Sequence, residues 1–394
     1  MEFPLLQSDM REEFDLRVEK VRKMMKEMKA DALLVGASSN LFYLTGGVFR
    51  GYVYIAADRD PMVFMIPPAE DKSELTRQVR KPEQIPASLA DAGYPAPKAI
   101  GLEMDDLIYS DLMRLGKLWP DALMVNGSGI LRGARLEKTA RELDMMRQDG
   151  KRQAAVYERI RFCYQEGMTD LEFQIEIERL LRREGCLGFL RAAGSRMEIN
   201  MGSVIAGPNA DTPSPYDFAM GGGGIDPSLP VGATGTILHA GMTVMVDMNG
   251  GFNGYQTDMT RCWSIGRVDQ KAVDVHECSR AILRDLEQYA KPGQEISHLY
   301  SRAVRLADDA GFGDYFMGHR HKVQFIGHGV GIELNEAPVI MERNKGRLKE
   351  NMTIALEPKF VLPQIGAVGV ENTYIVTKDG LENITALRED LQEL

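Results

Sequence analysis

The first third of the chain alternates between helical and strand-like hydrophobic patterns. Residues 12–29 have the spacing of an amphipathic helix, and short apolar runs that are typical of buried strands follow at 32–35, 52–57 and 62–66. Gly, Pro, Asn and Asp separate these runs, as expected where strands end and turns begin. Because strands alternate with helices, we predict an α/β unit built on a mostly buried mixed sheet.

A second helical pattern begins near Arg135. Apolar residues recur at helical spacing from Leu136 to Met146 among charged neighbours. We therefore predict a domain boundary at this point, with an N-terminal domain over residues 1–134 and a second domain over residues 135–394.

The segment that follows Thr169 carries two conflicting patterns. Glu172 completes a capping-box signature with Thr169, which indicates the start of a helix, whereas apolar residues between 171 and 177 alternate at strand period. We predict a helix here. From Arg191 onward the chain becomes rich in strand patterns, and we expect the glycine-rich stretch at 220–235 to be a long ordered loop.

Composition restricts the classes of function. The 394 residues are 44% hydrophobic, which is enough for two buried cores. A net charge of −10 would repel a phosphate backbone, so no nucleic-acid partner is expected. No apolar run approaches the roughly 18 residues of a membrane helix, and residues 1–13 are acidic rather than a basic leader, so we predict a cytoplasmic protein with no membrane partner. The four cysteines form no CxxC pair, which argues against a zinc knuckle or a disulfide framework.

Four carboxylates and one histidine lie in apolar or glycine-rich sequence, which is unusual for charged groups. Asp247 ends the apolar run VMVDMNGG, and Asp258 lies eleven positions later on the expected returning strand of a hairpin. Glu357 and Glu371 each interrupt an apolar strand, in ALEPK and GVENT, and His328 is flanked by glycines in IGHGVG. An Asp at a strand end is often only a turn former. Together, however, the five residues match the oxygen-dominated ligands of hard or borderline divalent ions, and buried carboxylates need a compensating charge.

The order and context of these five residues resemble the M24 metallopeptidase family of methionine aminopeptidase, prolidase and aminopeptidase P, which has the pita-bread fold. The N-terminal half resembles the creatinase/prolidase N-terminal domain, including NLFYLTGG at 40–47, and the catalytic half resembles the family from about Arg135 to Val376. The resemblance implies an α/β fold class, with a creatinase/prolidase-like α/β domain followed by an α+β pita-bread catalytic domain.

The same resemblance implies a pair of divalent metal ions about 3.5 Å apart. Asp247 would chelate one ion, His328 and Glu357 would bind the other, and Asp258 and Glu371 would bridge both. A water held between the ions would be the nucleophile, and Glu357 would be the proton shuttle. Manganese is the expected metal, and cobalt, zinc or iron would also fit such a site.

Several positions depart from the family pattern. Ser214 stands in GPNADTPSP where relatives place a histidine after the proline, and Gln324 stands where another histidine is usual, four residues before the metal-binding histidine. Asn335 followed by Glu336 replaces a His-Glu pair, and Gly369 replaces the arginine that is often found two residues before the last metal ligand. The metal ligands are thus retained while the residues around them are changed.

The replacements define the remaining candidate residues. Asn335 and Gln324 can donate hydrogen bonds to an oxyanion, although neither can shuttle a proton as histidine does, so we assign them to catalysis together with Glu357. His319 and His321 offer an alternative proton donor, although exposed loop histidines are the simpler interpretation. Our candidate substrate-binding residues are Ser214, His321 and Glu336.

The leading hypothesis is a dinuclear metal-dependent hydrolase of small peptides or amides, similar to Xaa-Pro peptidases and using a metal-bridging hydroxide. The alternative is a non-peptidase enzyme, another hydrolase or a lyase, on the same metal-bearing scaffold, because several family histidines are replaced. A pure binding module is disfavoured by the five retained ligands. A homodimer is expected from the resemblance alone.

Overall fold

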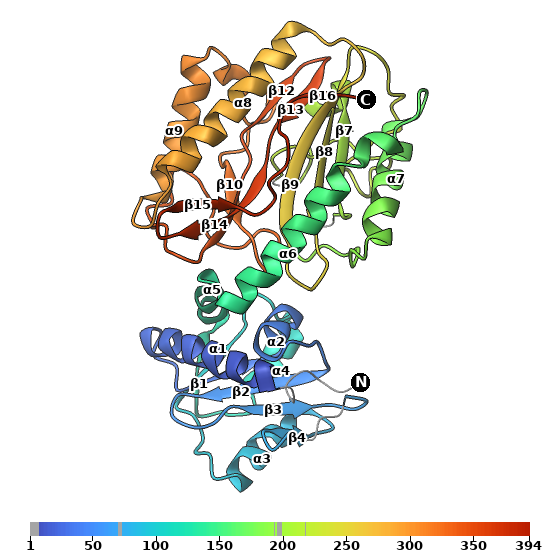
Figure 1. Cartoon of the computed structure of the whole chain (residues 1–394). Coiled ribbons are helices and arrows are strands. Elements are labelled where there is room, and N and C mark those ends of the chain that lie inside the picture. The colour runs from blue at the N-terminus through green and yellow to red at the C-terminus, as the bar shows by residue number, and fades with distance from the viewer. Residues whose placement is uncertain (1–7, 70–72, 193, 195–198, 217) are drawn as a thin grey trace. The chain divides into compact units, whose positions relative to one another are not determined.

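The computed structural model describes residues 8–69, 73–192, 194, 199–216 and 218–394. The chain divides into two compact units, Met1–Arg135 and Leu136–Leu394 (Figure 1). Within the described ranges, no helix combines the length and the apolar character that a membrane crossing requires.

A six-stranded mixed sheet forms the N-terminal unit, in the order β4-β3-β2-β1-β5-β6. Its strands are β1 (Ala32–Val35), β2 (Gly51–Ala56), β3 (Met62–Met65), β4 (Thr76–Gln78), β5 (Ala99–Leu102) and β6 (Leu123–Asn126). The central strand β1 pairs antiparallel with β2 and parallel with β5, and all four of its residues are buried. Burial on both faces explains why this strand has a continuous apolar sequence, and the sheet agrees with the mixed α/β unit predicted for this part of the chain.

The helices of this region are short apart from the first. They are α1 (Ser8–Glu27), α2 (Ser38–Thr45), α3 (Ile85–Asp91), α4 (Tyr109–Gly116) and α5 (Ser128–Leu136). The expected helix at 12–29 corresponds to α1, which begins four residues earlier and ends two residues earlier than predicted.

One buried carboxylate connects the sheet of the N-terminal unit to α2. Glu103 follows β5 and is completely buried. Its Oε2 accepts hydrogen bonds from the backbone N–H groups of Gly36 (2.6 Å) and Ala37 (2.8 Å), and its Oε1 accepts one from Asn40 Nδ2 (2.7 Å). The Asn40 Oδ1 in turn accepts from Arg135 Nη1 at 2.9 Å. Burial raises the pKa of Glu103, and the two backbone donors oppose this shift.

Two four-stranded sheets and a two-stranded ribbon form the C-terminal unit, in the orders β16-β9-β8-β7, β10-β11-β14-β15 and β12-β13. The strands of the first sheet are β7 (Gly202–Ala206), β8 (Thr243–Gly250), β9 (Thr257–Ser264) and β16 (Gln392–Glu393). Those of the second are β10 (Gly327–Gly329), β11 (Thr353–Leu356), β14 (Asn372–Thr377) and β15 (Gly380–Asn383). The ribbon consists of β12 (Lys359–Leu362) and β13 (Gly366–Gly369).

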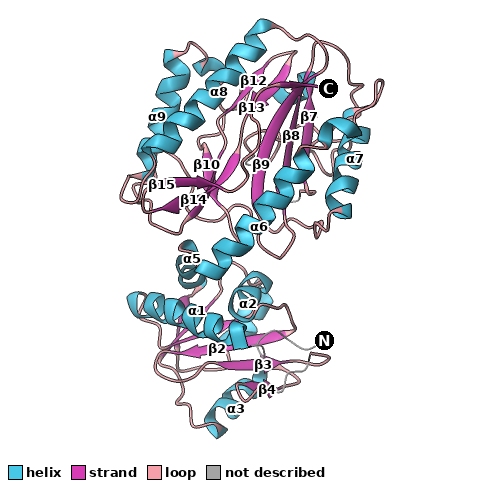
Figure 2. Ribbon diagram, viewed as in Figure 1, coloured by secondary structure: helices cyan, strands magenta, loops and turns pink. Residues whose placement is uncertain are grey.

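Four long helices flank these strands (Figure 2). They are α6 (Ala140–Tyr157), α7 (Asp170–Arg183), α8 (Gln270–Tyr289) and α9 (Ile296–Asp309). Helices α6 and α7 contact the β7–β9 sheet, whereas α8 contacts β12, β13 and α9 (Figure 1). Helix α7 confirms the helix predicted after Thr169. The Thr169 side chain accepts a hydrogen bond from the Glu172 N–H, and the capping box is complete. The capping signature therefore outweighs the strand-like alternation.

Candidate metal centre

A β-hairpin brings the two aspartates together. Asp247 lies in β8 and Asp258 in β9, and the antiparallel register pairs Asp258 with Asn249. Side chains two residues apart on a strand share a face, so Asp247 and Asp258 point to the same side of the sheet as diagonal neighbours.

Strand pairing also brings together the histidine and one glutamate, at strand β10 and at the end of strand β11. His328 in β10 pairs with Ala355 in β11, and Glu357 follows two residues later, on the same face as Ala355. Glu371 connects the two sheets, because it lies between β13 and β14 and forms an antiparallel bridge with Thr260 of β9. Residues that are distant in sequence thus converge where the two sheets meet.

The imidazole of His328 is oriented as a ligand. Its Nδ1 lies 3.0 Å from the carbonyl oxygen of Gly329, and because a carbonyl can only accept, the ring proton belongs on Nδ1. The Nε2 lone pair then faces Asp258 Oδ2 at 3.6 Å and Glu357 Oε1 at 3.8 Å. These separations are too long for hydrogen bonds, but they suit two ligands of one ion with bonds of about 2.0–2.2 Å.

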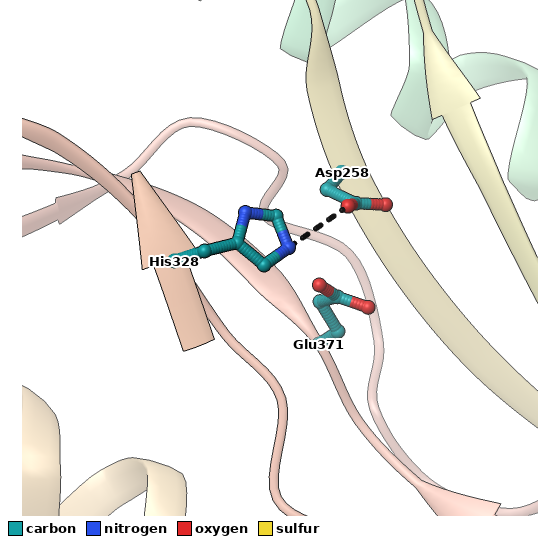
Figure 3. A group of neighbouring side chains, drawn as sticks. All are labelled: Asp258, His328 and Glu371. Atoms are coloured by element: carbon teal, nitrogen blue, oxygen red, sulfur yellow. Dashed lines mark ion pairs between the residues drawn. The ribbon is translucent and has the colours of Figure 1, made fainter. Parts of the chain in front are cut away.

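Glu371 carries an oxygen that lacks a partner. Its Oε2 accepts hydrogen bonds from Thr260 Oγ1 (2.7 Å) and Lys359 Nζ (2.9 Å), whereas its buried Oε1 has no partner among the described residues. One ligand atom from each of Asp258, His328 and Glu371 lies within 4.8 Å of the others (Figure 3). An unpartnered buried carboxylate oxygen is costly, and a cation would satisfy it. The residues therefore fit a divalent ion.

Lys359 is the residue of the centre that sequence reasoning missed. Its Nζ lies 2.8 Å from Asp247 Oδ2, 2.7 Å from Glu357 Oε2 and 2.9 Å from Glu371 Oε2, and the side chain is 1% exposed. The signal was present in ALEPK, because residues two apart on an extended chain face the same side and Lys359 follows Glu357 at that spacing.

Crowded carboxylates dominate the electrostatics. Burial, together with the neighbouring charge of Asp247, raises the pKa of Asp258 to about 7. Burial and the Asp258 charge also raise the pKa of Glu371 well above its usual range. Burial alone would lower the pKa of Lys359, but the surrounding carboxylates, Asp247 first, raise it well above its ordinary value. Lys359 therefore stays charged, and its single charge leaves much of the negative charge uncompensated.

A largely apolar cavity of about 190 Å³ opens onto the centre. Its polar lining includes four of the five proposed ligands together with Ser203, Asn249 and Asn335. The apolar lining includes Leu190, Phe218, Met220, Val231, Phe325 and Val339. A concave, mostly apolar space beside a few polar groups is the usual form of a small-molecule site.

The other predicted site residues lie in different surroundings. Gln324 is exposed and is not part of the cavity lining, although its neighbour Phe325 is. Ser214 and His321 line a smaller hollow of about 30 Å³ that adjoins the cavity, since residues 218–220 line both. Ser214 Oγ donates a hydrogen bond to the carbonyl of Pro230.

Glu336 has a structural ion pair. Its Oε2 lies 3.1 Å from Lys138 Nζ, and its Oε1 accepts a hydrogen bond from the Glu333 N–H at 3.1 Å. Both members of the Lys138–Glu336 pair are buried. Of the residues predicted around the metals, Asn335 alone lines the cavity as the structure describes it.

Comparisons with known proteins cover both units. The family model described as "Metallopeptidase family M24" matches residues 144–378, and that of the creatinase/prolidase N-terminal domain matches residues 17–136. The chain is 25% identical over 384 residues to the Xaa-Pro dipeptidase of Pyrococcus furiosus, with 95% of this chain and 99% of that protein covered.

Solved structures show the same fold. The Xaa-Pro dipeptidase from Bacillus anthracis matches with a TM-score of 0.80 at 22% identity, over 97% of this chain and 100% of the other. The prolidase from Pyrococcus horikoshii OT3 matches with a TM-score of 0.76 at 21% identity, over 95% and 99%. The predicted fold class, a creatinase/prolidase-like α/β domain with a pita-bread catalytic domain, is confirmed.

Proposed function

The chain belongs to metallopeptidase family M24 and is a hydrolase, and from this premise we propose that it cleaves small peptides with proline after the scissile bond. The observation that carries the proposal is the convergence of His328 Nε2 with the carboxylates of Asp258, Glu357 and Glu371 beside an apolar cavity. The Xaa-Pro dipeptidase that aligns with nearly the whole chain supports this choice of substrate.

A divalent ion would be held by His328, Asp258, Glu371 and Glu357. When bound, it supplies Lewis-acid activation of the scissile carbonyl and of water. Manganese is our first choice because oxygen donors dominate the site, and cobalt, zinc or iron would also suit this donor set. The dinuclear arrangement expected from the resemblance needs a further position beside Asp247, which Lys359 already contacts.

The cavity suits a short, partly apolar substrate. Its volume of about 190 Å³ lies below the roughly 300–1,000 Å³ of sites for larger ligands. Phe218, Phe325 and Val339 offer apolar surface for a proline ring, and the Asn335 amide can donate a hydrogen bond to a substrate carbonyl. Short Xaa-Pro peptides, especially dipeptides, are therefore the proposed substrates.

Glu357 is the proposed proton carrier. Its Oε2 is engaged by Lys359, while its Oε1 lies on the side of His328, and the residue lines the cavity. A carboxylate in this position can accept a proton from the attacking water and return it to the leaving nitrogen.

The direct test is hydrolysis of Xaa-Pro dipeptides, longer Xaa-Pro peptides and matched Xaa-Ala peptides by protein reconstituted with manganese. We expect turnover of the short Xaa-Pro peptides, and we expect Glu357→Gln to lower kcat by about 10²–10⁴-fold. Glu350→Gln changes an exposed glutamate and serves as the matched control, with activity retained. Equal turnover of the Xaa-Ala peptides would contradict the proposed proline preference.

A non-peptidase reaction on the same metal-bearing scaffold is the second candidate. It is favoured by Asn335, which lines the cavity where the resemblance would place a histidine. Binding of metal without turnover of any Xaa-Pro peptide would support this second candidate over the first. The homodimer and the cytoplasmic location stay predictions.

A further inference from the structure

We propose that Lys359 replaces one of the two cations expected at this centre, so that each chain holds a single divalent ion. The inference rests on the proposed metal dependence of the centre. The ion would lie among His328, Asp258 and Glu371, and the Lys359 ammonium would act as a permanent second cation beside Asp247.

The ammonium has all of its donors engaged by carboxylates. A lysine side chain offers three N–H groups, and Lys359 Nζ has three carboxylate partners at 2.7–2.9 Å, one each from Asp247, Glu357 and Glu371. It therefore occupies the space that lies between these three acids. A second divalent ion at Asp247 would have to displace the ammonium from the same oxygens, or else lie close to it and be repelled.

Glu357 and Glu371 each divide their two oxygens between two sides of the centre. Both use Oε2 for Lys359. Glu357 Oε1 lies 3.8 Å from His328 Nε2, and Glu371 Oε1 is buried without a partner among the described residues. This is how carboxylates bridge two cations, and here one of the two cations is already provided by the chain.

The neighbouring strand leaves room for the lysine. Gly369 in β13 pairs with Lys359 in β12. A Cβ atom at Gly369 would lie 2.9 Å from both Lys359 Cα and the Pro358 carbonyl oxygen, and 3.0 Å from Lys359 Cγ. Such contacts are too close, so a side chain at 369 would disturb the backbone and stem of Lys359. The glycine at this position and the buried lysine are therefore structurally linked.

The charge of the centre permits one divalent ion beside the lysine. Asp247, Asp258, Glu357 and Glu371 can carry four negative charges, of which Lys359 offsets one. A divalent ion beside neutral His328 would offset two more and leave one negative charge. A second divalent ion would leave a net charge of +1, and it would have to lie close to an ammonium that has no access to solvent.

The number of bound ions tests this proposal. The full-length protein is stripped with a chelator, titrated with manganese and separated from free metal, and bound manganese is counted by mass spectrometry. Electron paramagnetic resonance then distinguishes an isolated ion from a spin-coupled pair. We expect about one manganese per wild-type chain with the spectrum of an isolated ion.

The number of bound ions in two lysine variants shows whether Lys359 itself excludes the second ion. Lys359→Ala removes the ammonium and opens its space, so we expect about two ions and a coupled spectrum. Lys138→Ala removes the other buried, carboxylate-paired lysine of this unit, so the count should stay at about one. Two coupled ions in the wild type, or a count that stays at one in Lys359→Ala, would overturn the proposal.

The wild-type measurement remains decisive if Lys359→Ala does not fold. In that case Lys359→Arg, which keeps a cation, should still bind one ion, and binding of two would again contradict the proposal. Failure of the proposed metal dependence looks different, because no variant would then bind manganese and the single-ion inference would fall with it.

Discussion

Glu103 in the N-terminal unit and the carboxylates of the metal centre are both buried, but they are stabilised in opposite ways. Both oxygens of Glu103 accept hydrogen bonds from uncharged groups, two backbone N–H groups and the Asn40 amide. At the metal centre the principal partner is a charged group, Lys359, and one oxygen of Glu371 has no partner among the described residues. A buried acid alone is thus no sign of a metal, whereas clustered acids with an unsatisfied oxygen are.

Asp149 in α6 is an intermediate case. Its Oδ2 accepts hydrogen bonds from the backbone N–H groups of Phe252 (2.9 Å) and Asn253 (3.2 Å), while its buried Oδ1 lacks a partner among the described residues. Asp149 belongs to no group of three or more possible metal ligands among the described residues. An orphan oxygen without further ligands is better satisfied by a proton than by a metal ion.

The largest effect should come from removing the cation of the metal centre. In metal-free protein, Lys359→Ala leaves the buried Glu357 and Glu371 and the partly buried Asp247 without their ammonium. We expect a loss of about 3–5 kcal/mol in the free energy of unfolding. Denaturant unfolding with chelator measures this loss.

The stability gained from manganese should then differ between the Lys359 and Lys138 variants. At 100 times its Kd, each bound ion returns about 3 kcal/mol, so Lys359→Ala should gain more from manganese than the wild type does. Lys138→Ala should lose stability without this extra gain, since its partner Glu336 is not one of the proposed ligands. A loss below about 1 kcal/mol for metal-free Lys359→Ala would show that the ammonium is not needed.

A somewhat smaller loss of stability is expected at Glu103, whose hydrogen-bond donors are uncharged. Glu103→Leu leaves the N–H groups of Gly36 and Ala37 and the Asn40 amide without their acceptor, and we expect a loss of about 2–4 kcal/mol. Glu103→Gln keeps one acceptor oxygen and should lose less. Thermal unfolding with and without manganese should give the same difference from wild type for both variants. A difference that depends on manganese would mean that Glu103 belongs to a cation site, and it would contradict the contrast between the two sites.

The sequence predicted those features that depend on local pattern. The buried strand β1 and the capped helix α7 have unambiguous periodicity or capping residues. Asp247 was recognisable because it ends an apolar run, and Asp258 because it lies on the expected returning strand of a hairpin. The hairpin register places both on one face.

Features that depend on long-range packing were not predictable in the same way. Glu336 lies next to Asn335 in sequence, but its partner Lys138 is 198 residues away. The spacing of Lys359 from Glu357 places both on one side of the strand, but a lysine after Glu-Pro normally suggests an exposed position. Its burial against the carboxylates is visible only in the tertiary structure. Local patterns therefore identified the acids, whereas the cation that compensates them required the tertiary structure.

The smallest effect should be a pH dependence of stability that originates at Asp149. Burial raises the pKa of Asp149 to about 6, and the N–H groups of Phe252 and Asn253 only partly oppose this shift. Between about pH 4 and pH 6 the folded protein therefore holds a proton that the unfolded chain has released, so this contribution to stability is present below pH 4 and is lost as the pH rises to 6. The contribution should amount to about 1–3 kcal/mol.

Asp149→Asn retains an acceptor for the two N–H groups and does not titrate. It should remove this dependence of stability on pH when denaturant unfolding is measured from about pH 4 to pH 6. An unchanged slope would mean that Asp149 stays ionised when folded, and that two backbone donors on one oxygen are enough to stabilise a buried carboxylate.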